Sequence, residues 1–386
     1  MNIKSLEKKL FSRKEKFKIS ENQFFELKTN FYLSNILIIG AAGSIGKSFV
    51  LNLNKIKFKK LIMVDNNETG LADLNRDINL IYSKRVINKI QYICEDINNL
   101  KLHDLIKENK ITHYLNFSAL KHVRSEENFI STLNMFKTNS FSPFKLGKIK
   151  NLKSLKQIFF ISTDKAASPS SLMGCSKKIM ENNLNNFKKK NKKIVVSTIR
   201  FANVCFSNGS LLQNIFDKVQ RNEPFGCPSG IKRYFITHKE STNLCFKALL
   251  KESDNHIVLP TYKSLGSSIS FMELAEKIVK IMKKKPVFSK NIKNVKKNEQ
   301  LIIVNKNTIR GQKQDEILYE PQEKINFFKN DKELIKVKFY ENKKIKSIEK
   351  KILNSINLNQ IKNLCSKVFL NFGNKKIKTI LVKNII

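Results

Sequence analysis

The chain of 386 residues is long enough to bury a full hydrophobic core, as one large domain or two unequal ones. Its hydrophobic content of 41% argues against disorder, and no run of about 18 uninterrupted apolar residues predicts a membrane span. The formal net charge of +41 comes mostly from lysines spread over the whole chain. We attribute it to compositional drift in preference to a nucleic-acid-binding surface, although a positive field would still attract an anionic substrate.

The remaining global features concern the redox compartment and the leader. The six cysteines are scattered without a CxxC pair or a histidine-rich cluster, so they predict neither a disulfide frame nor a zinc site. Residues 1–23 are charged throughout and lack the apolar stretch of a secretory signal, and residues 1–33 are expected to be a polar, helical lead-in. We therefore expect a reduced, cytoplasmic protein without a metal, a membrane span or a nucleic-acid partner.

From Asn35 onward, short apolar runs rich in β-branched residues alternate with segments of helical length. The runs predict buried strands at 36–40, 61–65, 90–96, 113–119, 157–163 and 195–201. Helices are expected between them, for example at 44–56 and 98–109. This alternation predicts an α/β fold with a doubly wound parallel sheet of the Rossmann type, covered by helices on both faces. We place this core at 34–202.

The chain after about Ala202 is less regular. Apolar residues at helical spacing predict a helix over 271–284, whereas the polar, Pro-interrupted run 283–300 predicts a surface connection. We divide this part into a smaller region over 203–340, interleaved with the core, and a basic C-terminal extension over 341–386.

A glycine-rich turn, GAAGSIG over 40–46, lies between the first predicted strand and the helix that follows it. Glycines at this spacing let backbone N–H groups approach a pyrophosphate at a helix N-terminus. Asp65 ends the second strand about 20 residues further on, where a carboxylate can accept hydrogen bonds from ribose hydroxyls. Asp96 and Ile97, after the third strand, suit the adenine side. The turn alone could be a plain strand–helix connection, but its context predicts dinucleotide binding. The carboxylate of Asp65 favours NAD over NADP.

A second group of polar residues ends the fifth predicted strand. Asp164 and Lys165 are adjacent there, and an acid beside an amine can divide acid and base roles if their environments separate their pKa values. The alternative is a surface ion pair. Thr163 can bind the hydroxyl that reacts. Met173 and Lys177 are four residues apart and share one helix face, but a methionine cannot transfer a proton.

Five blocks in a shared order make the chain resemble the UDP-N-acetylglucosamine 4,6-dehydratases of polysaccharide biosynthesis, a group of extended short-chain dehydrogenases. The blocks are GAAGSIG (40–46), NFSALKHVRSEEN (116–128), STDKAASPSSLMGCSKKIMEN (162–182), RFANVCFSNGSLLQ (200–213) and IKRYFITHKEST (231–242). Together they cover roughly residues 35–250. The sequences of these blocks are most similar to the branch that acts in legionaminic acid biosynthesis, with UDP- or GDP-N-acetylglucosamine as substrate.

The resemblance implies a closed redox cycle on bound NAD(P). The sugar is oxidised at C4, loses the C5 proton and the C6 hydroxyl as water, and is reduced at C6 to a 4-keto-6-deoxy sugar. In this cycle Asp164 would protonate the leaving hydroxyl and Lys165 would act at C5. Met173 stands where most short-chain enzymes have the catalytic tyrosine, and Lys177 would hold the nicotinamide ribose. A homo-oligomer is also expected.

The motifs and the resemblance together predict the functional residues. Catalytic residues are Thr163, Asp164, Lys165 and Met173. Cofactor contacts are Gly40, Gly43, Ser44, Ile45, Gly46, Asp65, Asp96, Ile97, Ala119, Lys121, Asn139 and Lys177. Substrate contacts are His122, Asn203, Ser210 and Arg233, with Asn203 and Arg233 at the nucleotide half and Arg233 suited to the diphosphate. His113 is expected in the core.

Two alternatives to a dehydratase remain at this point. An epimerase shares the oxidation at C4 but generally needs a tyrosine at position 173. A dinucleotide-binding protein without turnover would not require the complete Thr163-Asp164-Lys165 set.

Overall fold

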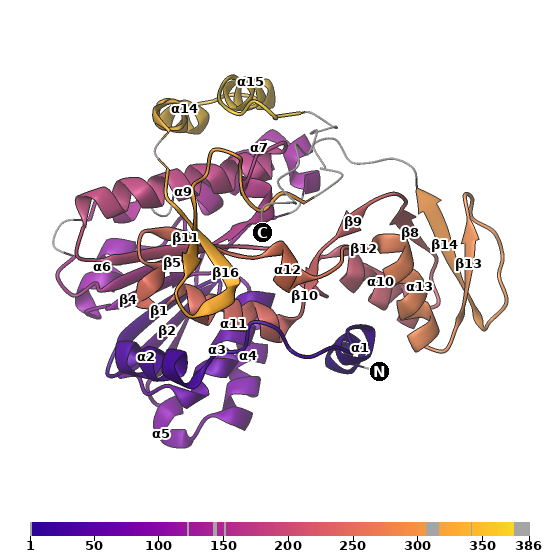
Figure 1. Ribbon diagram of the computed structural model, residues 1–386, viewed down its shortest axis with the longest axis horizontal. Helices are drawn as coiled ribbons and strands as arrows, with labels where there is room; N and C mark the ends of the chain where they lie inside the picture. Colours follow the sequence, from indigo (N-terminus) through magenta and orange to yellow (C-terminus); the bar gives the residue numbers. More distant parts are fainter. Residues whose placement is uncertain are drawn as a thin grey trace.

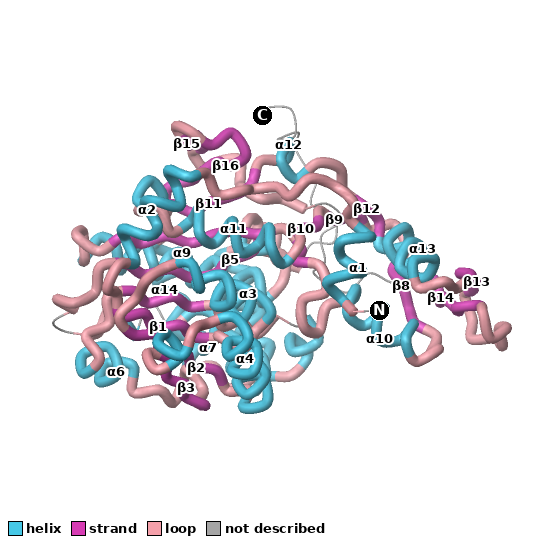
Figure 2. The backbone as a smooth tube through the Cα atoms, turned by 90° about the horizontal axis from the view of Figure 1, so that it is seen from below, coloured by secondary structure: helices cyan, strands magenta, loops and turns pink. Residues whose placement is uncertain are grey.

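The computed structural model describes residues 2–121, 123–141, 145–149, 152–305, 316–340 and 342–373. Its centre is a nine-stranded sheet in the order β15-β16-β11-β6-β5-β4-β1-β2-β3 (Figures 1 and 2). The strands are β1 (Asn35–Ile39), β2 (Lys60–Asp65), β3 (Ile90–Cys94), β4 (His113–Asn116), β5 (Gln157–Thr163), β6 (Val195–Phe201), β11 (His256–Pro260), β15 (Ile325–Phe328) and β16 (Asp331–Lys338).

The strands from β3 to β11 run parallel, and β16 and β15 are antiparallel additions at one edge. The central strands are buried on both faces, as Ile36, Leu37 and Ile38 on β1 illustrate, because helices cover the sheet on each side. This accounts for their continuous apolar runs. The predicted Rossmann-type fold is confirmed, and all six predicted strands are present.

Helices cover both faces of this sheet. They are α2 (Glu21–Phe31), α3 (Ser44–Asn52), α4 (Glu68–Ile81), α5 (Lys84–Ile87), α6 (Leu102–Glu108), α7 (Phe129–Ser140), α9 (Leu172–Lys190) and α11 (His238–Ala248). Helices α7 and α9 pack together on one face, whereas α3 and α11 pack together on the other (Figure 1). His113 lies in the core, as expected, with its ring stacked on Phe31 at 4.5 Å, and burial lowers its pKa to about 3.

A smaller lobe with its own apolar cluster lies beside the main sheet (Figure 1). It contains α1 (Ile3–Leu10), α10 (Leu211–Gln220), β8 (Phe225–Pro228), β9 (Lys232–Arg233), β12 (Ile269–Ser270), α13 (Phe271–Ile281), β13 (Lys285–Ser289) and β14 (Glu299–Asn305). The short strands β7 (Asn203–Val204) and β10 (Phe235–Ile236) pair, and α12 (Tyr262–Leu265) follows β11. The lead-in is thus divided, because α1 joins this lobe whereas α2 packs on the main sheet.

The prediction of a surface connection over 283–300 is wrong near both ends of this range, where the structure has strands. Strand β13 begins at Lys285 and pairs in parallel with β14, which begins at Glu299. The polar composition misleads because β13 is an edge strand, held by backbone hydrogen bonds on one side only. An edge position also tolerates Pro286, which has no N–H to donate.

The C-terminal extension adds two amphipathic helices, α14 (Lys343–Leu353) and α15 (Leu358–Val368). Both lie against α9, where Ile345, Ile352 and Ile361 enter a cluster with residues of α7 and α9 (Figure 1). Among the described residues, no helix has both the length and the apolar character needed to cross a membrane.

Candidate functional site

The glycine-rich turn connects β1 to α3 at the carboxyl edge of the sheet. Gly40 has a φ of +74°, and a Cβ there would lie 2.5 Å from the backbone nitrogen of Ser118. At Gly46 a Cβ would lie 2.1 Å from the carbonyl oxygen of Gly40. Gly43 caps α3 without a side-chain hydrogen bond, which leaves the first N–H groups of the helix available to an anion. The turn therefore fits a dinucleotide pyrophosphate.

A hollow of about 600 Å³ extends from this turn over the ends of β2 and β3. The predicted residues that line it are Gly40, Gly43, Asp65, Asp96, Ile97 and Ala119. Asp65 also shapes the turn, because Oδ2 accepts a hydrogen bond from Ala42 N (2.9 Å) and Oδ1 accepts one from Asn67 N (3.0 Å). The arrangement provides carboxylates where the ribose and adenine of a dinucleotide would lie.

A second hollow, of about 530 Å³, adjoins the first and leads to the predicted catalytic residues. The two share the lining residues Gly43, Phe117, Ala119, Leu120 and Asn208, so together they form one groove. The predicted residues in the second hollow are Gly43, Ser44, Ile45, Gly46, Ala119, Lys121, Thr163, Asp164, Lys165, Met173, Lys177, Asn203 and Ser210.

The acid and the amine are in contact. Lys165 Nζ lies 3.0 Å from Oδ1 of Asp164, and Thr163 Oγ1 donates to the same carboxylate oxygen at 2.8 Å. Asp164 is only 3% exposed, whereas the side chain of Lys165 is about one-third exposed to the hollow. A short 3₁₀ turn after β5, Asp164–Ala166, places both residues at the edge of the sheet. They are not a surface ion pair.

The second hollow also contains Lys121 and Lys177, and the pKa of each of these two lysines is lowered. Lys177 is 4% exposed and its Nζ donates to the carbonyl oxygen of Ile161 at 2.9 Å. Burial lowers the pKa of Lys177 to about 7. Lys121 Nζ donates to Ser207 Oγ at 3.1 Å, and burial together with the charge of Lys165 lowers the pKa of Lys121 to about 8. Lysines of this kind switch charge near neutral pH.

Met173 lines the hollow on α9, one turn before Lys177. The start of this helix is held by a carboxylate, because Leu172 N and Met173 N each donate to Glu126 at 3.0 Å. The backbone at Met173 is therefore fixed beside the hollow, and its side chain carries no transferable proton.

Asn139, Ser210 and Arg233 have structural contacts of their own. Asn139 is buried and binds both backbone groups of Leu120, so it supports the groove from behind. Ser210 Oγ accepts from Gln213 N and caps α10. Arg233 is only 4% exposed, is absent from the lining of this groove, and donates to the carbonyl oxygen of Lys232. His122 lies outside the described residues.

A buried carboxylate behind the groove, Glu316, was not predicted from the sequence. Glu316 accepts hydrogen bonds from the side chain of Asn203 and from Tyr234 N (2.6 Å), and lies 3.9 Å from Nε of Arg233. Burial and the charge of Asp164 raise the pKa of Glu316 to about 7. Composition could have indicated that this segment is unusual. Three glutamates fall within 316–323, in a chain with 73 basic and 32 acidic residues.

The other two glutamates of this segment belong to a buried ionic network. The guanidinium of Arg200, fully buried on β6, lies 2.7 Å from oxygens of Glu181 and Glu323. Lys178 donates to Glu320 and Glu323 at 2.8 and 2.9 Å. The network fastens segment 316–323 to the helix that carries Met173 and Lys177.

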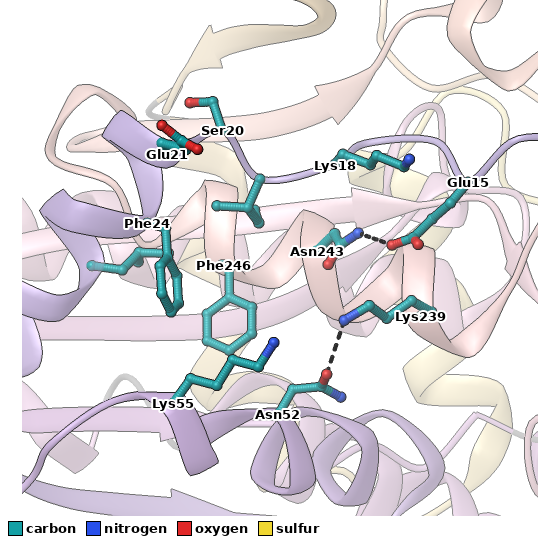
Figure 3. A pocket seen from close by; sticks show the side chains of 12 residues that line it. Glu15, Lys18, Ser20, Glu21, Phe24, Asn52, Lys55, Lys239, Asn243 and Phe246 are labelled. Carbon is teal, nitrogen blue, oxygen red and sulfur yellow. Dashed lines mark hydrogen bonds between the residues drawn. The ribbon is translucent and has the colours of Figure 1, made fainter.

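Another hollow, of about 360 Å³, lies away from this groove, between residues 15–27, the end of α3 and α11 (Figure 3). Four of its polar side chains are paired, since Asn243 donates to Glu15 and Lys239 to Asn52 (Figure 3). None of the predicted functional residues lines it.

Comparison with known sequences identifies related proteins. The family model described as polysaccharide biosynthesis protein matches residues 36–338. The capsular polysaccharide biosynthesis protein CapD of Staphylococcus aureus is 25% identical over 289 residues, which are 74% of this chain and 47% of CapD. The chain thus spans about half the length of that relative. An uncharacterized membrane protein of Methanocaldococcus jannaschii is 27% identical, over 85% of this chain and 99% of its own length.

Solved structures with similar folds were also found. Pen from Bacillus thuringiensis has a TM-score of 0.65 with 21% identity, over 80% of this chain and 88% of Pen. A UDP-glucose 4-epimerase from Thermotoga maritima has a TM-score of 0.55 with 19% identity, over 70% and 90%. WbmF of Bordetella bronchiseptica, in complex with NAD+, has a TM-score of 0.51 with 16% identity, over 65% and 79%. At these identities the likeness establishes the fold alone.

Proposed function

The chain belongs to the polysaccharide biosynthesis protein family, and on this premise we propose that it is a nucleotide-sugar 4,6-dehydratase. The proposed reaction converts UDP- or GDP-N-acetylglucosamine to the 4-keto-6-deoxy sugar with loss of water. The observation that carries the proposal is the contact of the buried Asp164 with Lys165, in a hollow also lined by Met173, which cannot serve as acid or base.

The groove is suited to a nicotinamide dinucleotide. The turn at Gly40 and Gly46 would hold its pyrophosphate, and Asp65 and Asp96 its adenosine half. When bound, the nicotinamide would accept and return the electrons of the sugar within one catalytic cycle. WbmF, a structural neighbour, was solved with NAD+ and with NADH. Asp65 favours NAD in our proposal, since a carboxylate repels a 2′-phosphate.

The proton transfers fall to the protein. Asp164, which lines the hollow, would protonate the leaving C6 hydroxyl. Lys165 would remove the C5 proton, because its side chain lines the hollow and is about one-third exposed. Thr163 would orient the C4 hydroxyl, and Lys177 would lie at the ribose of the nicotinamide.

An epimerase is the second candidate, because several structural neighbours are nucleotide-sugar 4-epimerases. Mass spectrometry of the purified protein with UDP- and GDP-N-acetylglucosamine distinguishes the two. A loss of about 18 Da without net reduction of the cofactor supports the dehydratase. An isobaric product that separates chromatographically from the substrate would instead support an epimerase and overturn the proposal.

A further inference from the structure

Asn203 lines the second hollow, and its amide nitrogen is bonded to two residues that do not line it, Glu316 and Tyr234. Nδ2 donates to Oε1 of Glu316 and to the carbonyl oxygen of Tyr234 (3.3 Å). A carbonyl oxygen and an ionised carboxylate only accept hydrogen bonds. Both partners therefore require the nitrogen, and not the oxygen, on the inner side. This settles the orientation of the amide by chemistry, because a flipped amide would set oxygen against oxygen.

The hydrogen bond from Tyr234 and the charge of Arg233 favour the ionised, accepting form of Glu316. Tyr234 N–H donates to Oε2 at 2.6 Å, and the guanidinium of Arg233 lies 3.9 Å from Oε1. Burial and the nearby Asp164 oppose ionisation and raise the pKa of Glu316 to about 7, so the carboxylate predominates above that pH. Because the side chain of Glu316 is 2% exposed, its bonds are shielded from water.

The oxygen of the same amide is left for the ligand. Asn203 Oδ1 has no hydrogen-bond partner within the described ranges, although the residue is half-buried and lines the hollow beside Asp164 and Lys165. An acceptor at this point pairs with an O–H or an N–H. It repels a phosphate oxygen, which is itself only an acceptor.

We propose that Glu316 is a positioning residue that holds Asn203 with its carbonyl oxygen toward the hollow, so that Asn203 binds a hydrogen-bond donor of the nucleotide sugar. This inference rests on the proposed function and sharpens it. The donor is a hydroxyl or an N–H, on the base, the ribose or the hexosamine, and the diphosphate is excluded. Substrates without this donor would leave Oδ1 unpaired and bind less tightly.

The variant Glu316→Gln tests the orientation with minimal change in shape. Tyr234 N–H would take the oxygen of the new amide, which leaves an NH₂ group facing Asn203. Asn203 would then turn its oxygen inward and present Nδ2 to the hollow. We expect about tenfold weaker binding of the nucleotide sugar at about pH 8, with dinucleotide binding unchanged.

A matched control exists in the same chain. Glu349 is a buried carboxylate that accepts from Asn183 Nδ2 at 2.8 Å, on the α9–α14 side of the molecule and outside the groove. Glu349→Gln should leave nucleotide-sugar affinity unchanged. Equal losses in the two variants, or no loss in Glu316→Gln, would overturn the proposal.

Calorimetric titrations with UDP and with UDP-N-acetylglucosamine, and with the corresponding GDP pair, locate the donor. A loss for both members of a pair assigns it to the nucleotide, and a loss for the sugar conjugate alone assigns it to the hexosamine. Absence of binding by the wild type would contradict the proposed function instead.

The orientation is also measurable without any ligand. In protein labelled with ¹⁵N at asparagine, the side-chain amide signals of Asn203 are those missing from Asn203→Asp. One proton should be shifted strongly downfield by the carboxylate of Glu316 and should return in Glu316→Gln. An unshifted pair in the wild type would refute the proposal, whatever the protein binds.

Discussion

The hydroxyl of Ser44, on the first turn of α3, accepts a hydrogen bond of 2.8 Å from the backbone N–H of Asn208. Ser44 belongs to the glycine-rich turn, whereas Asn208 lies in the loop before α10, 164 residues further along the chain. The bond lies where the two hollows of the groove meet, because Asn208 lines both of them. The two hollows are therefore parts of one surface.

Replacing single glycines of the turn by alanine should weaken NAD binding to different extents. Gly46→Ala should abolish measurable NAD binding, because its Cβ would lie 2.1 Å from the carbonyl oxygen of Gly40. Gly43→Ala is the matched control, since its Cβ would meet the same oxygen at 3.4 Å. Fluorescence titration with NADH measures both, and equal affinities would contradict the close approach.

Removal of the carboxylate at the end of β2 should discriminate between cofactors. We expect Asp65→Ala to weaken NAD by about tenfold and NADP by less, because only NAD gains from an acceptor at the free 2′-hydroxyl. The lost bond to Ala42 N affects both cofactors alike, so the ratio of the two dissociation constants is the informative quantity. An unchanged ratio would argue against a ribose contact.

The acid and base assignments predict loss of turnover with retention of structure. Asp164→Asn and Lys165→Ala should each reduce product formation at least about 100-fold while the bound dinucleotide is kept. Rates are followed by loss of the nucleotide sugar in chromatography. Near-wild-type turnover in either variant would refute the roles of this pair.

The buried lysine on α9 predicts a pH-dependent stability. With a folded-state pKa of about 7, below its ordinary value of 10.5, Lys177 binds fewer protons in the folded than in the unfolded protein between these values. Burial of the charged Lys177 therefore destabilises the folded protein fully below about pH 7. This destabilisation is relieved as the pH rises toward 10.5.

Lys177→Met removes this dependence. The free energy of unfolding of the variant minus that of the wild type should be most positive below pH 7 and should fall as the pH rises. Urea denaturation at several pH values measures this difference, in which the other titrating groups cancel. A flat difference would contradict the lowered pKa.

The Arg200 network predicts a large loss of stability from one neutralised partner. In Glu323→Gln, the buried guanidinium loses half of its compensating charge, and we expect about 3 kcal/mol of destabilisation in denaturant titrations. The half-exposed pair of Lys277 with Glu273 is the control, and Glu273→Gln should cost less than about 1 kcal/mol. Similar losses in both variants would show that burial does not set the value of these pairs.

Local patterns in the sequence were sufficient for the Rossmann core and for much of the groove. Apolar runs between helical segments identified the strands, and the residues of the turn and of 163–165 follow their strands directly. Because parallel strands end at one edge of the sheet, these separate motifs had to come together there. The same reasoning correctly assigned His113 to the core.

The tertiary structure decided what depends on pairing between distant segments. Glu316 meets Asn203 across 113 residues, and Arg200 meets Glu323 across 123. Strand β13 likewise forms from a polar sequence because backbone pairing at a sheet edge does not require apolar side chains. Such contacts have no periodicity of their own. Charged side chains become buried only where the fold brings their partners within hydrogen-bond distance, and that proximity is a property of the whole chain.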